Sequence, residues 1–98
     1  MATVVREAMI ANPTVSVVLP TFNRGGVLRR AAESVLALDE EALELIIVDD
    51  GSTDSTQREL QDLQDPRISV IALRFNSGAN VARNVGISAA RAPYVAFL

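Results

Sequence analysis

The side chains that point most clearly to chemistry in this sequence are two adjacent carboxylates, Asp49 and Asp50. They follow an apolar run at residues 43–48 (LELIIV), whose continuous part, residues 45–48, favours a strand covered on both faces. Successive side chains of a strand point to opposite faces, so one carboxylate can face a ligand while the other supports the next turn. We expect Asp50, with Asp49 beside it, to accept a hydrogen bond from a nucleobase N–H or a ribose hydroxyl. The alternative is an Asx-turn with helix capping by Ser52 or Asp54, which does not require a second Asp.

A second candidate segment is residues 20–24 (PTFNR), which separate a strand-like run from a helical pattern. A helix N-terminus favours an anion such as a diphosphate, and Arg24 is placed to pair with one. Phe22 offers an aromatic face on which a base can stack. The alternative is a plain turn in which Thr21 or Asn23 caps the helix and Phe22 is a core aromatic.

Arg83 is a third candidate, in a helix that the pattern predicts over residues 79–91. The inner face of this helix is unusually small, because it is made of Ala82, Gly86, Ala89 and Ala90. Small residues let a helix lie close to a sheet, so the Arg83 guanidinium is expected to project toward the ligand edge and a diphosphate. The alternative is a solvated surface arginine.

The elements that must position these residues alternate between strand and helix patterns. Strands are predicted over residues 15–19, 43–48, 68–73 and 94–98, and helices over residues 24–38, 54–63 and 79–91, the second helix beginning with an Asp54–Gln57 capping box. Alternation without hairpin turn signals predicts an α/β fold, a Rossmann-like three-layer α/β/α arrangement with a mostly parallel sheet. Ligands of such sheets bind outside the carboxyl ends of the strands, near the point where strand order reverses. The segments that follow the first three strands, residues 74–78 among them, should therefore meet at one site.

Residues 1–13 are predicted to be a leader, disordered or a short helix, outside a domain that spans residues 14–98. This start is mildly apolar but carries Arg6 beside Glu7, and it lacks the uncharged core of a secretory signal. No apolar run approaches the roughly 20 residues that span a bilayer. A cytoplasmic location without a transmembrane segment is expected.

Composition excludes several functions. The 98 residues carry 9 basic and 12 acidic side chains, a net charge of −3, which provides no footprint for a nucleic-acid backbone. His and Cys are absent, so the usual zinc ligands and thiol nucleophiles are absent too. Any metal would be a hard cation bound by oxygen atoms.

Four segments, in order along the chain, resemble the family-two glycosyltransferases, which are inverting enzymes with the GT-A fold. They are residues 15–24 (VSVVLPTFNR), 44–56 (ELIIVDDGSTDST), 76–86 (NSGANVARNVG) and 92–98 (APYVAFL). The resemblance implies binding of a nucleotide-sugar donor, most simply a UDP-sugar, for transfer to a polysaccharide, lipid or cell-envelope glycan. It implies that Pro20, Thr21, Phe22 and Asp50 contact uracil or another base, that Ser52 lies in the adjoining turn, and that Arg83 lies near the phosphates. Asn23, Arg24 and Asp49 complete the predicted nucleotide-binding set.

The same resemblance implies which functions this chain does not supply. In the family, the strand like residues 94–98 runs into an Asp-x-Asp or Asp-Asp motif that binds Mg²⁺ or Mn²⁺, and the acceptor pocket and catalytic base follow. None of these occurs within the 98 residues, so we expect no catalytic residue and no metal ligand here. The isolated chain should bind nucleotide weakly and not catalyse transfer. The uncovered edge around Val95 and Phe97 should favour homo-oligomers. The full-length protein is expected to be peripheral to the inner membrane face.

Three other classes of protein share parts of this pattern. A Rossmann dinucleotide-binding domain needs Gly-x-Gly-x-x-Gly in its first turn, and residues 21–26 read TFNRGG. A receiver domain has its acidic pair after the first strand, whereas this pair follows the second. A binding-only, regulatory relative of the transferases is compatible with the residues.

Overall fold

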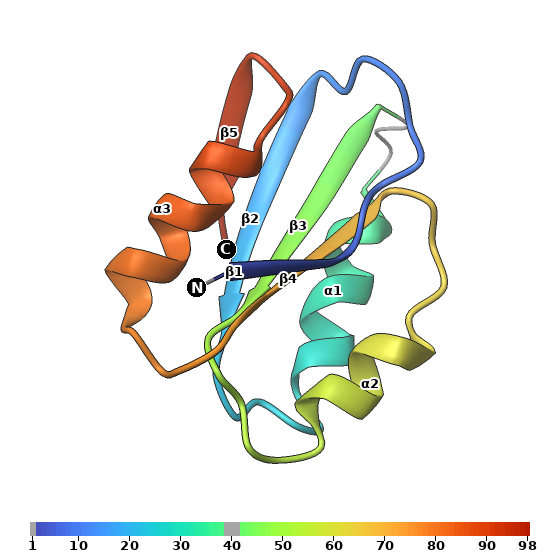
Figure 1. Cartoon of the computed structure of the whole chain (residues 1–98). Helices are drawn as coiled ribbons and strands as arrows, with labels where there is room; N and C mark the ends of the chain where they lie inside the picture. The colour runs from blue at the N-terminus through green and yellow to red at the C-terminus, as the bar shows by residue number, and fades with distance from the viewer. Residues whose placement is uncertain (1, 39–41) are drawn as a thin grey trace.

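The computed structural model describes residues 2–38 and 42–98, which form one mixed sheet flanked by helices (Figure 1). The five strands of this described part lie in the order β1-β4-β3-β2-β5. The strands are β1 (Ala2–Arg6), β2 (Val15–Thr21), β3 (Leu43–Asp49), β4 (Ile68–Leu73) and β5 (Tyr94–Phe97). The helices are α1 (Leu28–Leu36), α2 (Thr56–Asp62) and α3 (Ala79–Ala89).

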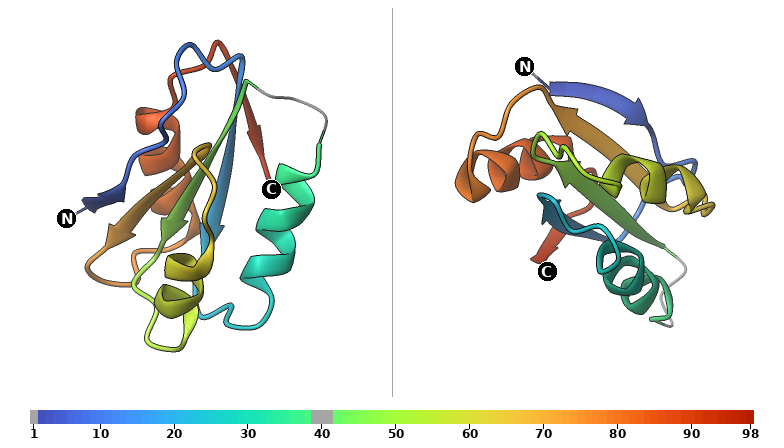
Figure 2. Two further views of the ribbon diagram at one scale, coloured as in Figure 1. Left: turned by 90° about the vertical axis from the view of Figure 1, so that its right-hand side faces the viewer. Right: turned by 90° about the horizontal axis from the view of Figure 1, so that it is seen from below.

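The predicted α/β fold with a mostly parallel sheet is confirmed. β2, β3, β4 and β5 pair in parallel, and only β1 runs antiparallel to its neighbour among the described strands. Helices α1 and α2 cover one face and α3 covers the other (Figure 2, right). The chain builds outward from β2 through β3 to β4 and then returns past β2 to add β5. Strand order therefore reverses between β2 and β5, where open α/β sheets bind their ligands.

The central strand β3 shows why its apolar run is continuous. All seven of its residues are buried, as expected of a strand with helices on both faces. Leu45 and Ile47 pack in the cluster that includes α1 and α2, while Ile46 and Val48 pack with Ala82 of α3.

Helix α3 lies close to the sheet, as its small inner face predicts. Ala82 and Gly86 are buried, whereas Ala90 is half-buried and Ala89 is exposed, so the prediction was wrong for Ala89. A Cβ atom at Gly86 would lie 2.4 Å from Cγ1 of Val18, too close for any side chain without movement. Glycine at this position therefore permits the approach of α3 to β2.

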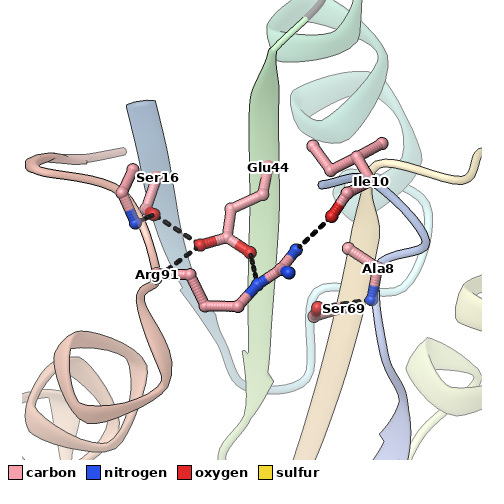
Figure 3. A network of polar contacts seen from close by, with 7 residues as sticks. Ala8, Ile10, Ser16, Glu44, Ser69 and Arg91 are labelled. Atoms are coloured by element: carbon pink, nitrogen blue, oxygen red, sulfur yellow. Dashed lines mark hydrogen bonds and ion pairs between the residues drawn. The ribbon is translucent and has the colours of Figure 1, made fainter. Parts of the chain in front are cut away.

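A buried polar network closes the amino end of the sheet (Figure 3). Glu44, at 1% exposure, accepts hydrogen bonds from Ser16 Oγ at 2.5 Å, from Arg91 N at 2.8 Å and from Arg91 Nε at 3.2 Å. Arg91 also donates to the carbonyl of Ile10 at 3.0 Å, and the N–H of Ala92 donates to Ser16 Oγ at 3.1 Å. The network joins β2, β3 and the turn before β5.

The prediction that residues 1–13 form a leader outside the fold was wrong for residues 2–6. β1 pairs antiparallel along β4, with Val4 opposite Ile71. The Arg6 guanidinium donates to the carbonyls of Leu60 at 2.7 Å and Leu63 at 2.6 Å, where α2 ends. The free edge of β4 and the open carbonyls of α2 thus order a segment whose own pattern is weak.

The helix starts also differ from the predictions. α1 begins at Leu28 with Val27 at its N-cap and no side-chain cap, so neither Thr21 nor Asn23 caps it. The Asp54–Gln57 capping box does not form, because Ser55 is the N-cap of α2 and Asp54 bonds the N–H of Thr56. The predicted helix over residues 24–38 is therefore shorter, and residues 22–27 form a loop. No helix in the described ranges is long and apolar enough to cross a membrane.

Candidate nucleotide site

A cavity of about 430 Å³ opens at the carboxyl end of the sheet, between β2, the end of β3 and α3. Six of the nine residues predicted to bind nucleotide line it, namely Pro20, Thr21, Phe22, Arg24, Asp50 and Arg83. The others, Asn23, Asp49 and Ser52, are not part of its lining. The structure therefore brings together the residues of three segments that are far apart in the sequence.

Phe22 and Asp50 are the two residues on which the base-binding interpretation depends, and they line the same cavity. Phe22 follows β2 and is 40% exposed, so part of its aromatic ring is open to a ligand. Asp50 follows β3 and is only 4% exposed. An aromatic face and a carboxylate that line one cavity can stack a flat heterocycle and accept a hydrogen bond from its edge.

The Asp50 carboxylate is held by backbone amides. Its Oδ1 accepts the N–H of Ser77 at 2.7 Å and its Oδ2 accepts the N–H of Gly78 at 3.0 Å. Gly78 is the N-cap residue of α3, which has no side-chain cap of its own, so Asp50 supplies acceptors there from another strand. Each carboxylate oxygen has further lone-pair capacity, so a ligand donor in the cavity can still bond Asp50.

Gly51 brings the segment before α3 next to Asp50. A Cβ atom at Gly51 would lie 2.6 Å from both Asn76 N and Phe75 C, and the φ of Gly51 is +74°. Both the close approach and the left-handed backbone require glycine here. The Gly that follows the acidic pair therefore has a defined steric function.

Asp49 supports the turn, as the strand geometry predicts for one member of the pair. Its Oδ1 accepts the N–H of Ser52 at 3.2 Å, and the residue is 1% exposed. It borders a separate small cavity together with Leu60 and Val70, on the side of α2. Asp49 Oδ2 and Thr21 Oγ1 are buried without hydrogen-bond partners in the part of the chain that the structure describes.

Asn23 and Ser52 join two loops. The N–H of Asn23 donates to Ser52 Oγ at 2.9 Å, and Asn23 Oδ1 accepts the N–H of Thr53 at 2.8 Å. Their side chains thus bind protein groups instead of bordering the cavity.

Arg24 and Arg83 place positive charge on the lining of the cavity. Both are exposed, and Arg83 Nη1 makes a long contact of 3.5 Å with Asn80 Oδ1. Two guanidinium groups beside an aromatic ring suit a ligand that carries a base at one end and phosphates at the other.

The residues present do not fit a divalent cation. Across residues 2–38 and 42–98, no group of three or more acidic, His or Cys side chains is placed to hold a metal ion. Both Asp50 oxygens accept backbone amides, and Asp49 borders the α2 side, so the adjacent carboxylates do not converge. No step of a reaction can be derived through a metal from these residues.

Five lining residues were not predicted individually. They are Asn76, Gly78, Ala79, Ala82 and Leu98. Asn76 and Gly78 lie in residues 74–78, a segment expected at the site because it follows a predicted strand. Nothing in the sequence pattern marks Leu98, which reaches the cavity because β5 lies next to β2.

Comparison with known proteins agrees with this geometry. Residues 16–98 match the model of "Glycosyl transferase family 2". The succinoglycan biosynthesis protein ExoO of Rhizobium meliloti (strain 1021) is 41% identical over 86 residues, which cover 88% of this chain and 25% of ExoO. TuaG of Bacillus subtilis (strain 168), whose name assigns it to teichuronic acid biosynthesis as a glycosyltransferase, is 46% identical over 88 residues, 88% of this chain and 35% of TuaG.

A solved structure is also similar. S. aureus TarS 1-349 in complex with UDP-GlcNAc superposes with a TM-score of 0.81 at 29% identity, covering 87% of this chain and 26% of that one. The chain belongs to glycosyl transferase family 2, with the fold of the amino-terminal part of a GT-A domain. It spans a quarter to about a third of the length of these curated relatives, 25% of ExoO and 35% of TuaG. Membership of this family argues against the two alternative classes, a Rossmann dinucleotide-binding domain and a receiver domain.

Proposed function

We propose that the cavity at the carboxyl end of the sheet binds the nucleotide part of a nucleotide-sugar donor, and that the donor is a UDP-sugar. In this proposal the donor serves an inverting transfer to a polysaccharide, lipid or cell-envelope glycan. The observation that carries it is the joint lining of one cavity by Phe22, Asp50, Arg24 and Arg83. The names of ExoO and TuaG, which refer to succinoglycan and teichuronic acid, support the acceptor class.

Each lining residue has a role in this proposal. The base stacks on Phe22, and a ring N–H donates to the Asp50 carboxylate. Pro20 and Thr21 border the base, and Arg24 and Arg83 face the diphosphate. The UDP-GlcNAc in the similar TarS structure supports this choice of ligand. Asn23, Asp49 and Ser52 act beside the nucleotide by shaping the two loops.

Isothermal titration of the 98-residue chain with UDP, UDP-GlcNAc and NAD tests the proposal. Base–aromatic stacking contributes about 1–3 kcal/mol, so Phe22→Ala should weaken UDP binding by about tenfold or more. Phe75→Ala is the matched control, because Phe75 is 67% exposed, lies under the Arg74 guanidinium and does not line the cavity. NAD binding as tightly as UDP, or equal losses in both variants, would contradict the proposal.

We further propose that Mg²⁺ or Mn²⁺ ligands and the base that deprotonates the acceptor are supplied from outside these 98 residues. The chain alone then binds nucleotide without catalysing transfer. A non-catalytic, regulatory relative of the transferases would behave in the same way. The reason is chemical, because a departing diphosphate needs charge stabilisation and the acceptor hydroxyl must lose a proton. Metal-dependent sugar transfer by the purified chain would overturn this part.

Two further proposals concern assembly and location. β5 lies at the end of the sheet, is exposed along its length and carries no charge, so it can pair with a second copy. A strictly monomeric chain in light scattering at high concentration would contradict such pairing. We place the protein in the cytoplasm, with the full-length form peripheral to the inner membrane face, and cell fractionation checks this placement.

A further inference from the structure

The loop that carries Phe22 and Arg24 is held in an unusual way. Four successive backbone N–H groups donate to side chains of one other segment. The pairs are Asn23 to Ser52 Oγ (2.9 Å), Arg24 to Thr56 Oγ1 (3.1 Å), Gly25 to Asp54 Oδ2 (3.1 Å) and Gly26 to Glu59 Oε2 (2.7 Å). We call Ser52, Asp54, Thr56 and Glu59 the bracket.

The conformation of the loop depends on these acceptors. Backbone donors need partners, and four in a row outside a helix or strand have no regular ones. Positive φ angles at Asn23 (49°) and Gly26 (86°) accompany this arrangement. A Cβ atom at Gly25 would lie 2.3 Å from Ser55 Oγ and 3.1 Å from Asp54 Oδ2 and Glu59 Oε2, so the loop lies close against the side chains at the start of α2. The bonds to Asp54 and Glu59 are charge-assisted, which makes them the strongest of the set.

The bracket is itself fixed. Asp54 Oδ1 accepts both the N–H and the hydroxyl of Thr56, which is fully buried. These bonds from Thr56 lower the pKa of the Asp54 carboxyl below its ordinary value of 3.8, the hydroxyl contributing most. Glu59 Oε2 also accepts the Ser55 hydroxyl at 3.1 Å. No bracket residue belongs to the lining of the cavity described above, so the bracket reaches the cavity by contact only through the loop.

We infer that Asp54 and Glu59 are positioning residues for nucleotide binding, which hold Phe22 and Arg24 at the cavity through the amides of Gly25 and Gly26. The inference rests on the proposed function and deepens it. Pre-organising a loop lowers the cost of ordering it when a ligand binds. The third acidic residue of the DDGSTD segment, Asp54, thus holds the neighbouring loop, while Asp49 supports the turn and Asp50 lines the cavity.

The double variant Asp54→Asn with Glu59→Gln tests this inference in the 98-residue chain, with UDP as the probe. The matched control is Glu33→Gln with Asp62→Asn, which removes two exposed carboxylates that accept none of the four amides. We expect the dissociation constant for UDP to rise about tenfold in the bracket variant and to change less than about twofold in the control. In NMR spectra, the amide protons of Gly25 and Gly26 should move upfield and exchange faster only in the bracket variant.

A double-mutant cycle separates positioning from general destabilisation. When Phe22 and Arg24 are both replaced by Ala, the bracket variant should add less than about a twofold further loss, because its effect passes through those two side chains. Three results would overturn the inference: full additivity in this cycle, unchanged Gly25 and Gly26 signals, or UDP affinity equal to that of the control. If the unmodified chain itself fails to bind UDP, the proposed function fails and the inference fails with it. If the unmodified chain binds UDP and the bracket variant binds it equally tightly, the inference fails and the proposed function stands.

Discussion

Two buried carboxylates near opposite ends of β3 have different surroundings. Glu44, at the amino end, is 1% exposed, and Asp50, just past the carboxyl end, is 4% exposed. Glu44 bonds the Ser16 hydroxyl and both the amide and the guanidinium of Arg91. Asp50 bonds the backbone amides of Ser77 and Gly78 and lines the cavity.

The difference lies in the kind of partner that each carboxylate has. The Arg91 guanidinium pairs with Glu44, and hydrogen bonds from Arg91 and Ser16 use both Glu44 oxygens, although Glu44 and Arg91 also border a small cavity of about 140 Å³. The hydrogen-bond partners of Asp50 in the described part of the chain are neutral backbone amides of one loop, and the residue lines the larger cavity. Both residues are buried, so the proposal that Asp50 binds a ligand and Glu44 does not rests on the kind of partner and on the cavity each one borders.

The largest expected effect is the loss of Glu44. Glu44→Ala should lower the free energy of unfolding by about 3 kcal/mol, the low end for breaking a buried ion pair, because the half-exposed Arg91 can be hydrated. Urea denaturation measures this change. UDP affinity per folded molecule should stay unchanged, and a loss of stability below about 1 kcal/mol would contradict a structural role for Glu44.

Gly86→Ala should have the next largest effect, because Gly86 lets α3 pack closely against Val18 of β2. The added methyl would lie 2.4 Å from Val18 Cγ1, and overpacking of this kind costs about 1–3 kcal/mol. Thermal or urea unfolding of the variant checks the loss of stability. Ser88→Ala, on the exposed side of the same helix, is the control and should be nearly neutral. Equal stability of the two variants would show that α3 can shift freely on the sheet.

Asp50→Asn should give the opposite pattern to Glu44→Ala. Loss of one amide partner and of the charge should cost about 1 kcal/mol of stability. UDP binding should weaken by about tenfold or more, because a base N–H donor no longer faces a carboxylate. Parallel urea denaturation and calorimetric titration measure the two quantities. A variant that loses stability but keeps its UDP affinity would assign Asp50 to the structural class of Glu44.

The smallest effect concerns Asp65, an acid that belongs neither to the lining of the cavity nor to the hydrogen-bond network of Glu44. The hydrogen bond from the Arg67 side chain lowers the pKa of Asp65 below its ordinary 3.8. Because the folded-state pKa is depressed, the stabilisation is present above pH 3.8 and is lost as the pH falls through the lowered pKa. Asp65→Asn should therefore lower the melting temperature slightly at pH 7 and by less as the pH falls below 3.8. A difference that does not shrink between pH 7 and pH 2 would contradict this assignment.

The parallel layer and much of the site were predictable from sequence because they depend on local patterns. Apolar runs and helical periodicity located β2 to β5 and the three helices, and the parallel topology then placed the segments after β2, β3 and β4 at one edge. The opposite directions of Asp49 and Asp50 followed from the alternation of a strand. The nucleotide-binding role of the predicted residues stays a prediction.

The rest depends on contacts between segments distant in sequence. β1 forms because β4 has a free edge, which its own short pattern does not reveal. Asp54 reads locally as a helix cap, yet one of its oxygens holds Gly25, 29 residues away in the sequence. Leu98 reaches the cavity only through the pairing of β5 with β2.

Amide NMR spectra of the unmodified chain during titration with UDP test the central claim most directly, because they report on both ends of β3 at once. We predict saturable shifts at Phe22, Asp50, Ser77 and Gly78, with the amides of Glu44 and Arg91 unmoved. Shifts that gather around Arg91, or no shifts at millimolar UDP, would contradict nucleotide binding at the carboxyl end of the sheet.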